Sequence, residues 1–363
     1  MWPDMRFLDL FGIDLPIVQA PMAGSSGAEL AIAVSEAGGL GSLPCAMLGP
    51  EQVRAELGIV RQRTSRPVNL NFFCHAEPTP DPEREAGWRK RLTPYYEEFG
   101  IDPVTIPTGA GRLPVDEAAC AVVEDMRPEV VSFHFGLPPA SLLDRVKASG
   151  AKVISSATTV EEARWLAARG CDAVIAQGYE AGGHRGMFLT QEMGRQVGTF
   201  PLVPQVVDAV DVPVIAAGGI ADGRGIAAAF ALGAAAVQIG TAYLRSPESL
   251  AGLAHRRALT SARDDSTVLT NVFTGRPARG FVNRFVREVG PISRAAPEFP
   301  LATAAVAPIR GAADADSGEF LPLWSGQAAA LAPDLPAGEL TRKLAAEATE
   351  RLDRLSKTGE AKA

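Results

Sequence analysis

Short, uniformly apolar runs alternate along this chain with segments of helical periodicity. This alternation is typical of repeated βα units that build a parallel sheet. The runs begin near Ile17, Leu40, Val68, Val130, Val153, Ala173, Val212 and Ala236. Because parallel strands are covered on both faces, their sequences are apolar throughout rather than alternating. The eight runs therefore predict an α/β fold, a (β/α)8 TIM-type barrel.

The segments between the runs carry the expected helix signals. Helical patterns cover residues 28–37, 50–63, 115–126, 141–149, 160–169 and 223–232. Gly38, Gly150, Gly170 and Gly233 directly follow four of these patterns, and glycine just past a helix is a common stop signal. We expect these helices to surround the barrel.

Two long segments fall outside this rhythm. Residues 76–112 and 270–336 are too long for plain connections, and long insertions in compact domains are usually functional. We expect them to associate into a small α+β cover over a discontinuous barrel formed by residues 1–75 and 113–269. Such a cover would limit access of water and shape a pocket.

The final segment, residues 337–363, changes pattern again. Its leucines at 340, 344, 352 and 355 follow a rough helical spacing. This spacing predicts an amphipathic helix that packs on the barrel or on a partner, with a frayed tail from Lys357 onward. The sequence leaves both a monomer and a homodimer open.

Composition narrows the classes of function. The chain of 363 residues carries 35 basic and 42 acidic residues, and this net charge of −7 opposes non-specific attraction to nucleic acid or anionic membranes. Asp4 and Asp9 fall where a secretory signal needs a basic end and an apolar block, so we expect a cytoplasmic protein. The apolar stretch 225–240 is too short to cross a bilayer. The 4 cysteines show no CxxC or zinc-type spacing and predict no metal site.

Polar residues collect where the apolar runs end. They include Gln19, Asn69, Asn71, His134, Ser155, Ser156, Gln177, Gln238 and Thr241. The carboxyl ends of barrel strands lie on one face, which is the face where barrel enzymes bind and react. We therefore expect these side chains to meet around one site.

Glycine-containing turns after the last two runs indicate a phosphate ligand. Gly218-Gly219 and Gly240-Thr241 could expose backbone N–H groups near a helix start, although tight turns alone are the simpler alternative. Residues 223–228 match a loose dinucleotide fingerprint, which is weak by itself. Asp222 would repel a pyrophosphate there and is better suited to cap the helix that follows.

The loop after the sixth run has the composition of an active site. Gln177, Glu180, His184 and Arg185 are crowded among glycines, which allow close approach of backbone to a flat ligand. Histidine titrates near neutrality, so His184 could donate or accept a proton. The alternatives are an orienting role for His184 and a solvated turn in which Glu180 and Arg185 pair with each other.

Together, the motifs at residues 19–22, 69–71, 177–186, 217–220 and 238–241 resemble those of the nitronate monooxygenase family, once called 2-nitropropane dioxygenases. Two further motifs, at 273–280 and 323–327, look like features of its class I members. The resemblance covers nearly the whole chain. It implies a flavoprotein that binds FMN without covalent attachment and oxidises alkyl nitronates with O2 to carbonyl compounds and nitrite.

The same resemblance implies roles for individual residues. The FMN contacts would be Met22, Asn71, Gln177, Gly182, Gly219, Gln238, Ile239, Gly240 and Thr241. His184 would be the catalytic histidine, and His134 and Trp324 would contact the substrate. His134 could equally well satisfy backbone groups at a strand end. His75 and His255 have no supporting context, and we expect surface or structural roles for them.

Other functions remain open because a barrel by itself specifies no reaction. FMN-dependent enoyl-acyl-carrier-protein reductases and NADH:quinone reductases resemble this chain across the same loops. The motif at 323–327 favours the monooxygenase, and without a recognisable nicotinamide-nucleotide motif we expect neither NADH nor NADPH to reduce the flavin. A barrel of the inosine-phosphate dehydrogenase type would need a cysteine after the sixth run, and none follows Cys171. A non-catalytic flavin-binding protein is the alternative from another class.

Overall fold

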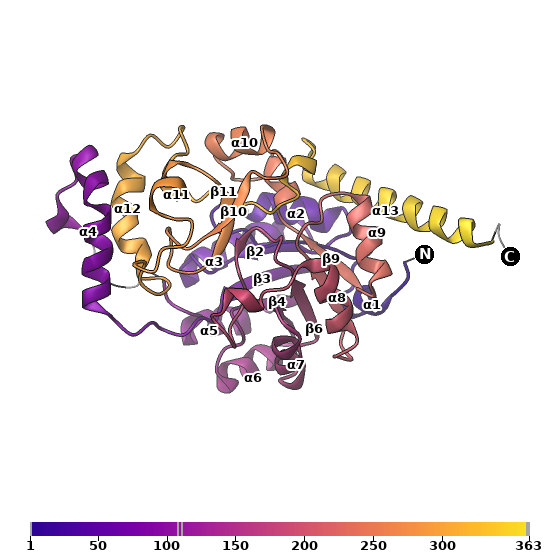
Figure 1. Ribbon diagram of the computed structural model, residues 1–363. Coiled ribbons are helices and arrows are strands. Elements are labelled where there is room, and N and C mark those ends of the chain that lie inside the picture. Colours follow the sequence, from indigo (N-terminus) through magenta and orange to yellow (C-terminus); the bar gives the residue numbers. More distant parts are fainter. Residues whose placement is uncertain (1, 107–108, 110–111, 361–363) are drawn as a thin grey trace.

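A closed barrel of parallel strands forms the centre of the computed structural model, which describes residues 2–106, 109 and 112–360 (Figure 1). Its strands are β1 (Ile17–Gln19), β2 (Gly41–Pro44), β3 (Val68–Phe73), β4 (Val130–His134), β5 (Lys152–Ala157), β6 (Ala173–Gln177), β8 (Val214–Ala217) and β9 (Ala236–Ile239). Neighbouring strands run in the order β1-β9-β8-β6-β5-β4-β3-β2. Val18 of β1 pairs with Leu40, next to β2, and this bridge closes the sheet. The predicted (β/α)8 barrel is confirmed.

Helices follow most of these strands and surround them. They are α2 (Ala28–Glu36), α3 (Pro50–Arg63), α5 (Glu117–Met126), α6 (Ala140–Ala148), α7 (Val160–Ala168), α8 (Thr199–Val207) and α9 (Gly223–Ala231). All except α8 were predicted to within about two residues. Prolines at 201 and 204 interrupt the pattern of α8 in the sequence. Pro201 lies in the first helical turn, where its missing N–H costs nothing, so the helix forms in spite of it.

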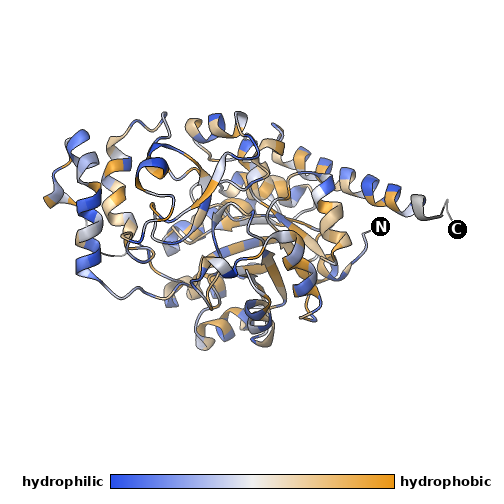
Figure 2. Cartoon of the chain, viewed as in Figure 1, coloured by the Kyte–Doolittle hydropathy of each residue, from blue (hydrophilic) through white to orange (hydrophobic). Residues whose placement is uncertain are grey.

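The amino-terminal end of the barrel is plugged by a helix that the sequence did not reveal, α1 (Arg6–Phe11). Its Phe7 and Phe11 are buried in one cluster with Val18, Ile154 and Ile215 from the strands. In Figure 2 many orange residues run through the barrel strands and helices, whereas α4 is mostly blue. With that end filled by apolar side chains, the carboxyl end of the strands remains for a site.

The terminal helix α13 (Ala337–Glu360) packs against α9 and α2 and extends beyond the barrel (Figure 1). Leu340 and Leu344 are buried on its inner face. The predicted helix is therefore present and contacts the barrel. It continues through Glu360, and residues 361–363 lie outside the described part of the chain. The fraying expected from Lys357 onward remains a prediction.

A second layer lies over the carboxyl ends of the strands. A small antiparallel sheet has the order β10-β11-β7, with β10 (Thr267–Thr270), β11 (Ala278–Phe281) and β7 (Gly183–His184). Beside it lie α4 (Pro82–Glu98), α10 (Leu253–Thr260), α11 (Arg284–Val289) and α12 (Ala302–Ala312). Short 3₁₀ segments are η1 (Pro103–Thr105), η2 (Met193–Arg195), η3 (Thr241–Arg245) and η4 (Ala329–Leu331).

Segments far apart in the sequence pack together in this layer. The indole N–H of Trp88 on α4 donates to the Ala302 carbonyl at 3.3 Å, and the Tyr96 hydroxyl donates to that of Ala305 at 2.8 Å. Trp88 and Tyr96 share a hydrophobic cluster, separate from the barrel core, with Phe285. Residues from 76–106 and from 270–336 thus contact each other. The division of the chain into barrel and cover domains remains a prediction, and residues 107–108 and 110–111 of the first cover segment lie outside the described residues.

Candidate active site

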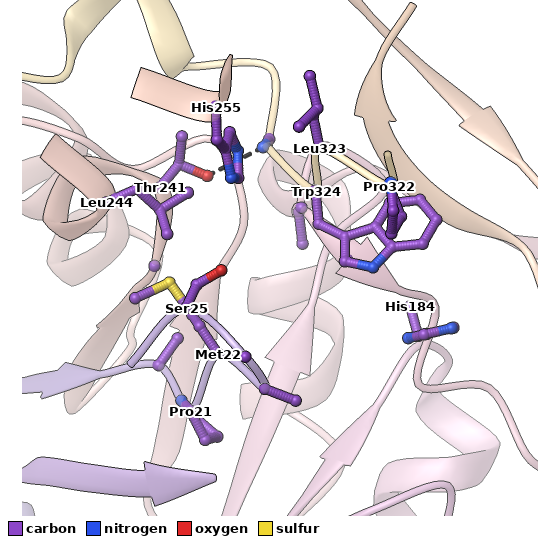
Figure 3. A pocket seen from close by; sticks show the side chains of 18 of the residues that line it. Pro21, Met22, Ser25, His184, Thr241, Leu244, His255, Pro322, Leu323 and Trp324 are labelled. Carbon is purple, nitrogen blue, oxygen red and sulfur yellow. Dashed lines mark hydrogen bonds between the residues drawn. The ribbon is translucent and has the colours of Figure 1, made fainter. Parts of the chain in front are cut away.

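A cavity of about 480 Å³ lies between the carboxyl ends of the barrel strands and the segments above them. Its floor comes from the ends of β3, β4, β5 and β6 and from the loops after β1, β6, β8 and β9, and its roof includes residues from 303–328. Figure 3 shows the indole of Trp324 next to the imidazole of His184, with Pro21, Met22 and Ser25 on the facing loop. The expected polar residues line this cavity with three exceptions, because Gln19, Asn69 and Ser155 are completely buried and bond other protein groups instead.

Almost all of the predicted site residues line this cavity. They are Met22, Asn71, His134, Gln177, Gly182, His184, Gly219, Gln238, Gly240, Thr241 and Trp324. Ile239 is the exception. Its side chain lies in the hydrophobic core between the strands and helices, and its carbonyl accepts the Ala20 amide at 2.8 Å. Strand alternation explains this, because the side chain after inward-facing Gln238 points out of the barrel.

The loop that carries His184 is held in place by the β-sheet above it. Gly183 and His184 form β7 and pair with Arg279 and Ala278 of β11. Arg185 is completely buried and donates to the carbonyls of Gln177 and Gly178. The segment is thus a strand fixed on two sides rather than a solvated turn.

Glu180, at the start of this loop, bonds Thr199 rather than Arg185. Its carboxylate accepts hydrogen bonds from the Thr199 amide at 2.8 Å and the Thr199 hydroxyl at 2.7 Å. Thr199 begins α8, and a carboxylate is favourable at a helix amino terminus. The alternative in which Glu180 pairs with Arg185 is therefore wrong.

The His184 ring lies among aromatic side chains. Its Nε2 is 3.0 Å from the Thr274 hydroxyl, and its ring centroid is 5.3 Å from that of Phe299 and 5.5 Å from that of Trp324. Burial, followed by the nearby positive charge of Arg112, holds the pKa of His184 well below its ordinary value. The imidazole is therefore neutral at physiological pH.

His134 also faces the cavity, but both of its ring nitrogens are occupied. Nε2 is 3.2 Å from the His184 carbonyl, and Nδ1 is 3.0 Å from the Ser156 hydroxyl. Burial and the charge of Arg276 lower the pKa of His134 to about 3. His134 thus satisfies a backbone group, the His184 carbonyl, as one of the two alternatives expected.

Two arginines that line the cavity bring positive charge to it. Arg112 lies over the rings of Phe73 and Phe299, 5.6 and 5.7 Å from their centroids. Arg310 projects from α12, and its Nε is buried without a hydrogen-bond partner. Among the described residues neither guanidinium has a carboxylate within ion-pairing distance. Burial and the charge of Arg310 both lower the pKa of Arg112, so the pair, here called the cationic patch, favours an anion.

The glycines after β8 and β9 line the cavity. Gly218 and Gly219 have φ values of +115° and +69°, which side chains rarely adopt. The Thr241 hydroxyl oxygen accepts the Gly326 amide at 2.9 Å (Figure 3), which leaves its hydrogen for a ligand. The Gln238 Oε1 atom is buried without a partner. An orphaned acceptor and glycine backbone at the cavity wall fit a large polar ligand.

The fingerprint at residues 223–228 is a helix start, as expected. The Asp222 carboxylate accepts from the amides of Arg224 at 2.9 Å and Gly225 at 3.3 Å and so caps α9. These amides are occupied and cannot receive a pyrophosphate. The Asp222 prediction is confirmed.

Several residues of the site could not be recognised from sequence alone. Arg112 and Arg310 line the cavity but lie outside every motif, and Thr274 falls within 273–280 without an assigned role. His75 and His255 are both buried, so the surface alternative for them is wrong. His255 lines the cavity and bonds the Ser325 hydroxyl at 2.9 Å. For Arg112, the only signal in the sequence was that segment 76–112 is rich in arginine.

Two other kinds of site can be assessed over the described residues. No group of three or more His, Cys, Asp or Glu side chains there is placed to hold a metal ion. No helix in that part of the chain is long and apolar enough to cross a bilayer.

The fold and cavity are those of a barrel enzyme, and comparison with known proteins identifies its family and its oxidoreductase class. The nitronate monooxygenase family model matches residues 5–347, so the chain belongs to this family. A nitronate monooxygenase of Pseudomonas aeruginosa is 45% identical over 94% of this chain and 98% of its own length. One of Paraburkholderia phytofirmans is 42% identical over 96% of both chains.

Solved structures agree with this assignment. The nitroalkane oxidase of Streptomyces ansochromogenes superposes with a TM-score of 0.87 at 42% identity, covering 96% of this chain and 99% of that one. FabK of Thermotoga maritima gives a TM-score of 0.74 at 31% identity, covering 97% and 98%. The family and its FabK-like neighbours are flavoenzymes.

Proposed function

We propose that this protein binds FMN and uses O2 to oxidise alkyl nitronates to a carbonyl compound and nitrite. The observation that carries the proposal is the cationic patch in the same cavity as His184, whose pKa it helps to lower. A nitronate is a planar anion, and the unpaired guanidiniums of Arg112 and Arg310 would attract it. The names of the relatives support the same substrate class.

The residues present fit FMN. Gly219, Gly240 and Thr241 would hold the phosphate through backbone amides and a hydroxyl, and Gln238 and Asn71 would supply polar partners for the rest of the cofactor. Asn71 lines the cavity, and its amide donates to the Ser132 hydroxyl at 2.9 Å. When bound, the flavin supplies the electron transfer and the oxygen chemistry.

The chain's own residues would bind the anion, orient it and exclude water. Trp324 and Phe299 flank His184 and would shield the reacting carbon. Thr274 fixes the imidazole. Because burial and then the charge of Arg112 disfavour the imidazolium form of His184, a proton abstracted from a neutral nitroalkane would be held poorly. This arrangement favours a substrate that arrives already ionised.

In this proposal the cover, residues 76–112 and 270–336, has the task of selecting the substrate. It contributes Arg112, Thr274, Arg310 and Trp324 to the cavity, and the barrel contributes the glycine loops and His184.

Anaerobic single-turnover reduction tests the proposal. Purified protein is expected to be yellow and to release one FMN on denaturation. A nitronate should bleach the flavin rapidly, whereas NADH and NADPH should not. The likeness to FabK makes a reductase the second candidate, and rapid bleaching by either nucleotide would replace the monooxygenase with it. Flavin that no substrate bleaches would identify an inert binder, and recovery of FAD would refute the cofactor.

A further inference from the structure

The main-chain carbonyl of His184 accepts two side-chain hydrogen bonds. The Gln177 amide donates from Nε2 at 3.0 Å, and His134 approaches with Nε2 at 3.2 Å. A carbonyl oxygen can only accept, so Nε2 of His134 must carry the proton in this contact. Both donors come from strand ends of the barrel, β6 and β4.

Ser156 completes the arrangement at the other side of the His134 ring. Its hydroxyl lies 3.0 Å from Nδ1. In a neutral ring with the proton on Nε2, Nδ1 is an acceptor, so the serine hydroxyl donates to it. That bond stabilises the one tautomer that can donate to His184. Neither ring nitrogen is then free for a substrate.

The next residues show how closely the loop is held against these side chains. The Gly186 amide donates to Gln177 Oε1 at 2.7 Å. A Cβ at Gly186 would come within 2.9 Å of His134 Cε1 and 3.1 Å of Ser156 Cβ. The segment is thus fixed from below by side chains and from above by β11.

We propose that His134 is a positioning residue for His184 rather than a substrate ligand, and that Ser156 selects the tautomer in which it works. His134 sets the depth of the His184 main chain, and so the place of the imidazole relative to the reacting carbon. A displacement of a catalytic group by about 1 Å can cost about a hundredfold in rate. The inference rests on the proposed role of His184 in nitronate oxidation.

The first arm of the test is independent of activity. The holoenzyme is labelled with ¹⁵N histidine, and the His134 signals are assigned with His134→Phe or, if that variant does not fold, by their change in Ser156→Ala. The expected result is the neutral Nε2–H tautomer at neutral pH in the wild type. A neutral Nδ1–H ring or an imidazolium would overturn the proposal.

The second arm measures kcat and KM with nitronates of two chain lengths. His134→Phe keeps the ring and removes both hydrogen bonds, and we expect kcat to fall about tenfold with KM unchanged. Ser156→Ala should lower kcat about threefold. The matched control is Ser42→Ala, which removes a buried hydroxyl that accepts from Asn69 and does not line the cavity. Its kcat should equal that of the wild type.

The outcomes separate the explanations. A rise in KM with kcat preserved would make His134 a substrate ligand and overturn the inference, as would wild-type kinetics in both variants. Equal losses of kcat in Ser42→Ala would show a merely structural effect and also overturn it. A wild type that does not oxidise nitronates would refute the proposed function instead, and the tautomer measurement would still decide whether the His134 contact exists.

Discussion

The cavity has two walls with different chemistry. The barrel wall is formed by Asn71, His134, Gln177, Gly219 and Gln238, and the cover wall by Arg112, Thr274, Thr303, Arg310 and Trp324. On the barrel wall most polar side chains already bond other protein groups, as Gln177 bonds His184 and Gly186. On the cover wall the guanidiniums of Arg112 and Arg310 have no such partners among the described residues. Side chains whose hydrogen bonds are made within the protein hold the wall rigid, whereas charged groups without such bonds are available to a ligand.

This difference indicates that cofactor retention and substrate selection are separate properties of the two walls. Changes on the barrel wall should affect flavin binding or the place of His184. Changes on the cover wall should affect the affinity for an anion and leave the flavin in position. The variants below test that separation in order of expected effect.

The largest effect is expected at Gly219, in the proposed phosphate site. Gly219→Asp places a carboxylate against the phosphate site and should abolish FMN binding, because like charges repel there. Gly219→Ala is the matched control, since it carries the same strain at φ +69° without the charge. It should weaken binding much less. Released cofactor and the visible spectrum measure occupancy, and full occupancy in Gly219→Asp would refute the site.

The next largest effect is expected at His184, whose main chain is fixed by hydrogen bonds and which lines the cavity. If it is a base, His184→Asn should lower turnover of a neutral nitroalkane by roughly a hundred- to ten-thousandfold. Turnover of the matching nitronate should fall less, because only anion placement is lost. The variant must keep the wild-type flavin spectrum. Equal losses for both forms would make His184 a positioning group, and wild-type rates for both would remove it from catalysis.

The cover wall should show a selective effect on charge. Arg112→Met and Arg310→Met should each raise KM for a nitronate about tenfold, the value of one charge-assisted hydrogen bond. KM for the neutral nitroalkane should not change. Arg263→Met is the control, because its exposed guanidinium pairs with Asp265 away from the cavity. Loss of FMN from either cavity variant would contradict the separation of the two walls.

The smallest effect is expected at Asp222, which caps α9. Asp222→Ala removes the cap of α9 and should lower the free energy of unfolding by about 1 kcal/mol with FMN retained. Asp222→Asn keeps an acceptor and should lose less. Burial opposes the charged form of Asp222, but the bonds from Arg224 and the Gly225 amide outweigh it and lower the pKa. The stabilisation is therefore present above the unfolded pKa and is lost as pH falls through the folded one. Urea midpoints at several pH values would measure it.

How far the sequence predicts this structure depends on the range of the forces involved. The strand from Val68 and the helix from Pro50 are visible because burial on both faces and a glycine or proline boundary leave local patterns. The helix α8 was missed because Pro204 obscures its pattern, and α1 because six residues are too few for one. Ile239 was placed in the site by its motif, although strand alternation turns its side chain outward.

The sequence by itself determined the barrel, the glycine loops and the position of His184 after the sixth barrel strand, because each depends on neighbours within a few residues. Only the tertiary structure decided the protonation of that histidine and the charge of its surroundings. Arg112 and Arg310 come from distant segments, and Thr274 reaches the His184 ring from beyond the barrel. Burial and electric fields act through space, so the pKa of a side chain is a property of the folded molecule.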